Sequence, residues 1–359
     1  MNGRPEPPAA PSAPDPRLES LTRWIREGLV RRGATVEPAS ADASFRRYFR
    51  VRDAGRTYVA MDAPPDKEDL GPFVGVARAL DAIGVHVPRI LEEDRAQGFL
   101  LLTDLGSRHY LAALNGGGDV DRLYADAAES LLAIQVRGHA HAAGLAPYGV
   151  HLLDREVQLF PEWFLDRHLG MPPDAATRDL VERTSARLAV AALEQPQVFV
   201  HRDYHSRNLM VHEERNPGIL DFQDAVRGAV TYDLVSLYKD CYVVWPRVRV
   251  LGWVRDYRRR ALAAGLPLPD DAEFVRWFDL MGVQRHLKVL GIFARLWYRD
   301  GKPGYLHDLP TVLAYVLEAV RDYAELAELA RLLDEAVVPR FEAAQQRALA
   351  DARARASRP

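Results

Sequence analysis

The chain has 359 residues, which is long enough for two lobes that each bury a core. Its formal net charge is −3 and it contains no basic run, so the composition argues against nucleic acid as a partner. A single cysteine, Cys241, rules out an intramolecular disulfide and favours the reducing cytoplasm. No apolar run approaches the roughly 18 residues of a membrane span, so neither a signal peptide nor a membrane partner is expected.

The N-terminal segment changes character after its first 17 residues. Residues 1–17 are rich in proline and alanine and are predicted to be a disordered tail. A helix is expected to begin at Pro16, because the first helical position needs no N–H donor, and to end at Gly33. Apolar residues recur along it at helical spacing, at Leu18, Leu21, Ile25 and Leu29.

A strand-rich segment follows. Strands are predicted over residues 34–38, 45–52 and 57–61, with period-two alternation in the second. The small residues 39–44 form a predicted loop, and the backbone N–H groups of such a loop can lie over nucleotide phosphates. Ser44 and Arg46 are therefore candidate nucleotide-binding residues. A plain three-stranded meander explains the segment about equally well, because the loop contains no glycine.

A helix over residues 67–83 and strands over 87–91 and 98–102 are predicted to complete the first lobe. The pattern breaks at Thr103-Asp104-Leu105-Gly106, where an N-lobe (residues 18–105) is expected to give way to a C-lobe (106–340). Residues 341–359 are interpreted as a helix end or tail. A hinge strand offers backbone hydrogen bonds to an adenine edge, so the predicted base contacts are Thr103, Asp104 and Leu105. A turn without special function is an equal alternative.

Helices dominate the second part of the chain. They are predicted over residues 121–136, 154–169, 174–193, 231–244, 247–264, 271–297 and 310–333. His139–His151 is interpreted as a loop with surface histidines, because its histidines lack further metal ligands at suitable spacing. The polar run Gln284–Lys288 occupies all sides of an otherwise apolar helix. Some of its side chains are therefore expected to line a polar pocket.

The stretch from Val198 to Phe222 carries the chemistry. It contains His201-Arg202-Asp203 and, five residues after Asp203, Asn208; Asp221 follows an apolar run. The spacing matches the catalytic-loop pattern H-R-D-x-x-x-x-N of phosphoryl-transfer enzymes. In that chemistry one carboxylate aims the attacking hydroxyl, while an amide oxygen and a second carboxylate hold Mg²⁺ against nucleotide phosphates.

Local structure supports this interpretation. Residues 208–211 and 218–220 are predicted to form a hairpin, which brings Asn208 and Asp221 to one end beside Asp203. For any single residue, a surface salt bridge or an ordinary strand end is the better explanation, whereas the four-residue combination indicates phosphoryl transfer. Asp233, at the start of a predicted helix, is expected either to cap that helix or to brace the catalytic loop.

These strings carry a resemblance over residues 34–333. His201–Asn208 and Leu220-Asp221-Phe222-Gln223-Asp224 resemble the aminoglycoside phosphotransferase (APH/choline kinase) family of small-molecule kinases. The resemblance implies an α+β, protein-kinase-like bilobal fold with a small antiparallel-sheet N-lobe and a mainly helical C-lobe. Longer strings, such as the one from Leu220 to Leu237 and Gln284–Leu296, resemble the bacterial anomeric kinases of N-acetylmuramate and N-acetylglucosamine in peptidoglycan recycling.

The resemblance also implies roles for individual residues. ATP would be the co-substrate, Mg²⁺ the cofactor and Asp203 the catalytic residue, with Asn208 and Asp221 as metal ligands. Expected sugar contacts, besides Asp203, are Asp224, Arg285 and His286, and Arg207 is expected to hold the transferred phosphate. For Arg285 an interhelical salt bridge is nearly as good an explanation. A kinase for an aminoglycoside, choline or homoserine, or a non-catalytic nucleotide-binding protein, remains an alternative.

The sequence departs from the family at one position. Kinases of this fold hold the α- and β-phosphates with a lysine on the third strand. Here that position lies near Met61, and the nearest lysine, Lys67, follows Pro65. Either Mg²⁺ carries more of the charge or an arginine substitutes, with Arg46, Arg47 and Arg50 as candidates.

Overall fold

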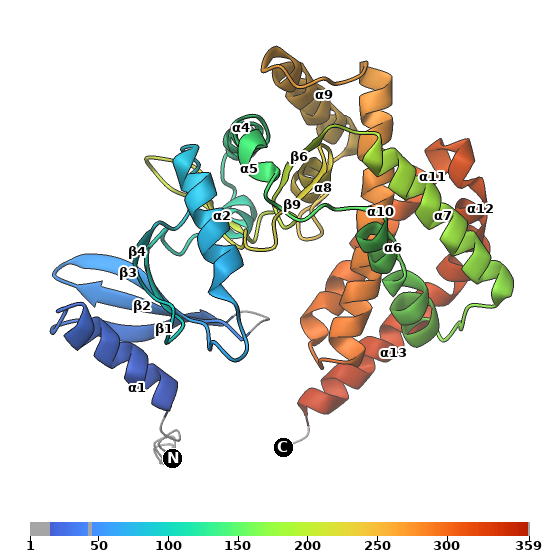
Figure 1. The fold of residues 1–359 in the computed structure, drawn as a ribbon. Coiled ribbons are helices and arrows are strands. Elements are labelled where there is room, and N and C mark those ends of the chain that lie inside the picture. The colour runs from blue at the N-terminus through green and yellow to red at the C-terminus, as the bar shows by residue number, and fades with distance from the viewer. Residues whose placement is uncertain (1–14, 42–44, 358–359) are drawn as a thin grey trace. The chain divides into compact units, whose positions relative to one another are not determined.

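A computed structural model describes residues 15–41 and 45–357 (Figure 1). Residues 1–14 of the predicted tail and the candidate Ser44 lie outside the described residues, whereas Pro16 and Arg17, also assigned to the tail, begin the first helix. The chain forms two compact units. The first comprises the described residues up to Gly75 together with Pro88–Leu105, and the second comprises Val76–Val87 and the described residues from Gly106 onward.

The first unit is built on a five-stranded antiparallel sheet with the strand order β1-β2-β3-β5-β4. Its strands are β1 (Thr35–Ala41), β2 (Arg47–Asp53), β3 (Arg56–Asp62), β4 (Ile90–Asp94) and β5 (Phe99–Thr103). Helix α1 (Pro16–Arg23) and the π-helix η1 (Trp24–Gly28) bury Leu21 and Ile25 against Phe49, Val51 and Leu101 of the sheet. Alternation along β2 thus places its apolar side chains toward this core.

Several boundaries in the first unit differ from the prediction. The N-terminal helical segment ends with η1 at Gly28 rather than at Gly33. Strand β1 continues through residues 39–41, which were expected in a loop, because after a register shift Ser40 and Ala41 pair with the start of β2. Helix α2 (Leu70–Ala82) begins three residues later than expected, because residues 64–67 form a turn. Strand β4 begins at Ile90 rather than at Val87, because Pro88 has no N–H to donate to a sheet.

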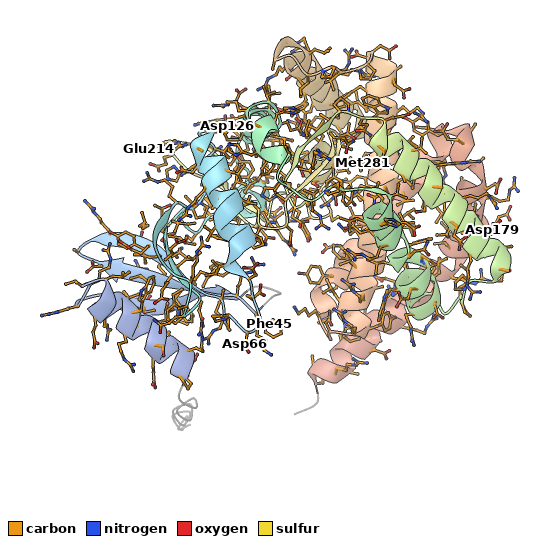
Figure 2. The ribbon with its side chains drawn as sticks, viewed as in Figure 1. Phe45, Asp66, Asp126, Asp179, Glu214 and Met281 are labelled. Atoms are coloured by element: carbon orange, nitrogen blue, oxygen red, sulfur yellow. The ribbon has the colours of Figure 1, made fainter. Side chains whose placement is uncertain are left out.

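The second unit is mainly helical (Figure 1). It is organised around α10 (Asp271–Tyr298), which is buried along most of its length. Met281 of this helix lies in the interior (Figure 2). A Cβ at Gly291 would overlap the backbone of Leu159, so the glycine permits the close approach of that segment. The other helices are α3 (Tyr110–Asn115), α4 (Val120–Arg137), α5 (His139–Ala142), α6 (Val150–Val157), η2 (Phe160–His168), α7 (Ala175–Leu193), α8 (Tyr232–Tyr238), α9 (Arg247–Ala263), η3 (Pro303–Asp308), α11 (Leu309–Asp322), η4 (Ala324–Leu326), α12 (Ala327–Leu332), η5 (Leu333–Val337) and α13 (Val338–Ala356).

Several helix boundaries also differ from the prediction. The expected loop 139–151 contains α5, and the helix expected over 154–169 is divided into α6 and η2. Helix α8 ends at Tyr238 rather than near Val244, because Lys239 leaves the helical conformation at φ −115° and its buried ammonium bonds to Asp279. Within residues 15–41 and 45–357, no helix is long and apolar enough to cross a membrane.

Candidate active site

The catalytic loop leaves a buried two-stranded sheet of the second unit. Strand β6 (Gln197–Val200) pairs antiparallel with β9 (Val226–Ala229), and the chain turns out of β6 at His201. The His201 ring is buried, and its Nδ1 accepts a 3.3 Å hydrogen bond from the N–H of Asp203. Burial lowers the pKa of His201 to about 4, so the ring is neutral at pH 7 and acts as a fixed acceptor.

Arg202 has a strained backbone that its neighbours hold in place. Its φ of +78° lies in the left-handed region, which a side chain disfavours. Asp233 accepts hydrogen bonds from the N–H groups of His201 at 2.7 Å and Arg202 at 3.0 Å. The Arg202 carbonyl accepts from Nη1 of Arg285 at 2.9 Å and from the hydroxyl of Ser236 at 3.3 Å. Both adjoining peptide groups are therefore fixed.

Of the two roles considered for Asp233, the structure supports bracing of the catalytic loop. Helix α8 takes Thr231 as its N-terminal cap residue, and that cap has no side-chain hydrogen bond. Burial raises the pKa of Asp233 to about 7, although the two N–H donors oppose this rise.

Replacing Asp233 with alanine should lower the free energy of unfolding by about 2–5 kcal/mol, because two buried N–H groups would lose their acceptor. Urea denaturation of the wild type and the variant measures this difference. Asp300→Ala is the matched control, since Asp300 pairs with its neighbour Arg299 at the surface, and a change below about 0.5 kcal/mol is expected there. An equally small change for Asp233→Ala would contradict the bracing role.

Asp203 itself is partly accessible, with 41% of its side chain exposed. Its Oδ1 lies 3.7 Å from Nη2 of the buried Arg285. Burial alone would raise the pKa of Asp203, but Arg285 and other nearby cations outweigh it and lower the pKa to about 2. The carboxylate is therefore ionised at neutral pH.

A buried polar cluster stands behind Asp203. Glu156 of α6 accepts from Arg202 at 2.6 Å and pairs with Lys288 at 3.0 Å, and the Tyr148 hydroxyl bonds its other oxygen. Lys288 and Arg285 each donate to the hydroxyl of Tyr232 at 3.1 Å. Burial would raise the pKa of Glu156, but Lys288 and Arg202 outweigh it and lower the pKa. The cluster therefore fixes the cations around Asp203.

The polar run of α10 thus has a structural explanation. Arg285 and Lys288, three residues apart on one helix face, both reach this cluster, and Gln284 donates to the Tyr148 hydroxyl at 3.1 Å. The sequence predicts the polar surroundings of this run but gives no signal for Glu156, which joins through tertiary packing.

Asn208 and Asp221 meet as predicted. Strands β7 (Leu209–Met210) and β8 (Gly218–Ile219) form the expected hairpin. Its end places Nδ2 of Asn208 3.2 Å from Oδ2 of Asp221 and 3.0 Å from the carbonyl of Asp203. Gln223 donates to Oδ1 of Asp221 at 2.7 Å, and the φ of +61° at Asp221 turns the chain sharply there.

The donor set suits a hard divalent cation that is bound mainly through phosphates. Because Nδ2 of Asn208 donates to two acceptors, its amide oxygen is the atom left to coordinate. One amide oxygen and one carboxylate, completed by phosphate and water oxygens, is a composition that Mg²⁺ accepts. In the described part of the chain no group of three or more His, Cys, Asp or Glu residues could hold a metal alone.

A cavity of about 100 Å³ adjoins Asp203 within the second unit. Arg285, Lys288 and Tyr242 line it on the polar side. An apolar wall is formed by Val289, Ile292 and Phe293. The remaining lining residues are His205, Ser236, Lys239, Asp240 and Cys241. The cavity thus combines fixed polar groups with an apolar surface beside the ionised carboxylate.

The other predicted contacts in the second unit lie in different surroundings. Arg207 is exposed, and its guanidinium carbon lies 3.5 Å from the ring centroid of Tyr242. Asp224 is exposed three residues after Asp221. His286 is buried, with Nε2 3.1 Å from the Lys239 carbonyl and its ring stacked on Tyr315. Because His286 does not line the cavity, this placement argues against a direct sugar contact.

The three predicted arginines of the first unit are distributed among four acidic partners. Arg47 pairs with Asp62 at 2.6 Å and also with Asp15, and Arg50 pairs with Asp104 at 2.9 Å. Nε of Arg46 lies 3.9 Å from Glu68. The other oxygen of Glu68 accepts from the N–H of Phe45 at 3.1 Å, so Glu68 holds the start of the segment that contains Arg46.

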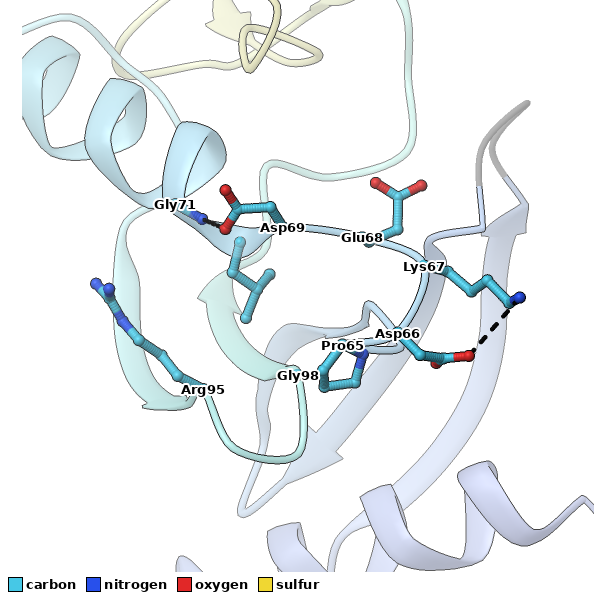
Figure 3. Close-up of a pocket in the computed structure, with 9 residues that line it drawn as sticks. Pro65, Asp66, Lys67, Glu68, Asp69, Gly71, Arg95 and Gly98 are labelled. Atoms are coloured by element: carbon cyan, nitrogen blue, oxygen red, sulfur yellow. Dashed lines mark hydrogen bonds and ion pairs between the residues drawn. The ribbon is translucent and has the colours of Figure 1, made fainter.

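The remaining first-unit candidates can also be placed. Lys67 is exposed and pairs with Asp66 at 3.7 Å, at the rim of a pocket of about 480 Å³ (Figure 3). It therefore does not occupy the third-strand lysine position. Thr103 uses its hydroxyl to accept from the N–H of Arg89 at 2.9 Å, and Leu105 is buried. A base contact by these residues would thus use backbone groups other than the N–H of Thr103, which donates to the carbonyl of Arg89 at 3.0 Å.

Comparison with known proteins identifies the family. The model of the phosphotransferase enzyme family (APH) matches residues 35–278. The chain belongs to this family. It is 50% identical over 331 residues to the N-acetylmuramate/N-acetylglucosamine kinase of Pseudomonas aeruginosa, covering 89% of this chain and 96% of that protein. It is 44% identical over 327 residues to the Neisseria meningitidis kinase of the same name, with the same coverages.

Solved structures show the same fold. Choline kinase LicA from Streptococcus pneumoniae matches with a TM-score of 0.56 at 11% identity, covering 87% of this chain and 99% of that one. ADP-bound aminoglycoside phosphotransferase APH(2'')-Ib matches with a TM-score of 0.54 at 12% identity, covering 84% and 98%. The predicted α+β, protein-kinase-like fold, with a small antiparallel sheet and a mainly helical remainder, is confirmed.

Proposed function

We propose that this phosphotransferase is a sugar kinase that uses ATP to phosphorylate the 1-hydroxyl of N-acetylmuramate, N-acetylglucosamine or both, in peptidoglycan recycling. The site geometry carries the proposal: Asp203, Asn208 and Asp221 converge, with Asn208 bonded to both of the others. Kinases of these two sugars that are 44–50% identical to this chain over nearly their full length support the choice of acceptor. The single buried cysteine, Cys241, is consistent with a cytoplasmic location.

Asp203 would position the acceptor hydroxyl and take its proton. The sugar oxygen attacks the γ-phosphorus, the bond from that phosphorus to the β,γ-bridging oxygen breaks, and ADP leaves. An anomeric hydroxyl is more acidic than an ordinary alcohol, so an ionised carboxylate is a sufficient acceptor for the proton. Arg285 fixes the carboxylate from behind, which keeps the partly exposed side chain aimed.

Asn208 and Asp221 would hold Mg²⁺ through the amide oxygen and the carboxylate. When bound, the ion supplies neutralisation of phosphate charge. Gln223 keeps Asp221 oriented through its 2.7 Å hydrogen bond. The rate would come mainly from positioning and electrostatic stabilisation rather than from covalent chemistry.

Arg46 is our choice for the residue that replaces the missing third-strand lysine. It lies directly before β2, the strand that follows the predicted phosphate loop, and Glu68 lies beside its Nε at 3.9 Å. Such a pair corresponds in chemistry to the lysine–glutamate pair of protein kinases. Ser44 and the backbone of Thr103–Leu105 complete the proposed nucleotide contacts. On the acceptor side, we propose Asp203, Asp224 and Arg285 as contacts to both sugars, and Arg207 as a contact to N-acetylmuramate only.

Incubation with Mg²⁺-ATP and a panel of acceptors tests the function. The panel holds N-acetylmuramate, N-acetylglucosamine, an aminoglycoside, choline and homoserine, with ADP release as the first readout. We expect ADP release with one or both sugars, and phosphorus NMR should place the new ester on the anomeric carbon. Transfer to choline, homoserine or the aminoglycoside alone would support the alternative kinases. No ADP with any acceptor would support a non-catalytic nucleotide-binding protein.

A further inference from the structure

We infer that Arg207 binds the lactyl carboxylate of N-acetylmuramate and so sets the preference between the two sugars. This inference rests on the proposed sugar kinase function. N-acetylmuramate differs from N-acetylglucosamine by a lactyl ether on O3, which is anionic at neutral pH. An enzyme that takes both sugars can favour N-acetylmuramate through a cation that pairs with the lactyl carboxylate and that stays in water when N-acetylglucosamine binds.

The position of Arg207 suits this role. It lies four residues after Asp203 and directly before Asn208, on the catalytic loop, and its side chain is exposed. Its guanidinium carbon lies 3.5 Å from the ring centroid of Tyr242 and 6.0 Å from that of Tyr305. Stacking on an aromatic face holds the guanidinium plane while leaving its in-plane N–H groups for a carboxylate.

Tyr242 connects Arg207 to the cavity beside Asp203. It lines this cavity, and its ring also packs against the guanidinium of Arg207. A sugar that presents its 1-hydroxyl to Asp203 must place O3 on the far side of the carbon that bears the acetamide. The apolar wall of Val289, Ile292 and Phe293 suits the acetamide methyl. The lactyl group would then extend from the ring toward the rim of the cavity.

The cations inside the cavity are already paired. Lys239 lies 3.1 Å from Asp279, Lys288 lies 3.0 Å from Glu156, and all three of Lys239, Lys288 and Arg285 are buried. Arg285 faces Asp203 at 3.7 Å and donates to a backbone carbonyl. An additional carboxylate would therefore have to compete with an acid that already faces each of these three cations, and disrupting the buried pairs of the two lysines is costly.

Arg207 has no such commitment. Among residues 15–41 and 45–357, no carboxylate lies within 4.0 Å of its guanidinium. Asp308 acts electrostatically on the same region, but burial raises its pKa even though Arg207 opposes the rise. Because no ion pair within 4.0 Å holds the guanidinium in the described part of the chain, it is available to form the forked pair that carboxylates prefer.

The test compares Arg207→Gln and Arg207→Lys with the wild type on both sugars, using saturating Mg²⁺-ATP. We expect Arg207→Gln to lower kcat/KM for N-acetylmuramate by about 10–100-fold, mainly through KM, because a charge-assisted hydrogen bond is lost. For N-acetylglucosamine the change should stay within about twofold. Arg207→Lys should recover part of the loss, since it keeps the charge without the fork.

Two controls separate the carboxylate from other causes. Arg249→Gln removes another arginine of the same unit that lies 5.1 Å from two tryptophan ring centroids, and it should leave the ratio of the two kcat/KM values unchanged. The 3-O-methyl ether of N-acetylglucosamine is a neutral acceptor with a substituted O3, and it should be as insensitive to Arg207→Gln as N-acetylglucosamine.

Three outcomes would overturn the inference: an equal loss for both sugars, no loss for either, or an equal loss for the neutral 3-O-methyl ether. An equal loss would instead assign Arg207 to the transferred phosphate or to the geometry of the loop. The proposed function is tested separately, by the wild-type protein alone. It would be wrong if the wild-type protein phosphorylated neither sugar. That result requires no variant.

Discussion

Asp203→Asn should fold like the wild type and lose about 10²–10⁴-fold in kcat, because asparagine cannot accept the proton of the acceptor hydroxyl. The carboxylate is ionised at neutral pH, since Arg285 and nearby cations lower its pKa to about 2 against the effect of burial. The substitution keeps the side-chain shape and the 3.3 Å hydrogen bond from its N–H to His201. The loss should therefore appear in turnover and not in the circular dichroism spectrum.

Asp203→Asn should also lower the thermal stability slightly, because Arg285 loses the negative charge that it faces at 3.7 Å. Thermal unfolding should be compared with that of Asp300→Asn, a carboxylate outside the site that pairs with its neighbour Arg299. That control should retain wild-type turnover. Turnover of Asp203→Asn within about threefold of the wild type would remove Asp203 from the chemistry and leave the polar cluster as a purely structural feature.

Asp221→Ala should abolish the Mg²⁺-dependent part of nucleotide binding. The substitution removes the carboxylate of the proposed metal pair and also the acceptor of Asn208 at 3.2 Å and of Gln223 at 2.7 Å. Calorimetry with an ATP analogue, with and without Mg²⁺, gives the measurement. In the wild type the ion should tighten binding, and in the variant the two titrations should coincide.

Asp334→Ala is a suitable control, because Asp334 pairs with Arg321 in a salt bridge away from the catalytic loop. It should show the same Mg²⁺ dependence as the wild type. If Asp221→Ala retained that dependence, Asp221 would not be a metal ligand. Retained ATP affinity with lost Mg²⁺ dependence would still agree with the assignment, since the first unit also contributes proposed nucleotide contacts.

The catalytic loop is the part of the site that sequence reasoning predicts well. Asp203, Asn208 and Asp221 are related by short spacings and one hairpin, so local chain geometry brings them together. Register within a two-residue ladder leaves little freedom once both strands are recognised. The longer sequence segments that resemble the kinase family extend the prediction from the catalytic loop to the whole fold.

Contacts between distant segments are less accessible from the sequence. Glu156 reaches Arg202 and Lys288 only because α6 and α10 pack on the catalytic loop, and nothing near Glu156 in the sequence marks it. The same reason explains the misplaced end of α8, where the pairing of Lys239 with Asp279 overrides helical propensity. The pairing of Arg50 with Asp104, 54 residues apart, likewise depends on tertiary structure.

Position 202 faces opposing demands from its backbone and its side chain. Glycine adopts a φ of +78° with little strain, so the backbone at this position would be less strained without a Cβ. The guanidinium, however, supplies one of the two positive charges that offset Glu156 in the interior. A glycine there would relax the turn and, within residues 15–41 and 45–357, leave Glu156 with Lys288 alone as an ion-pair partner. A variant that relaxes the backbone at position 202 would therefore leave the buried negative charge of Glu156, near the catalytic Asp203, less well neutralised.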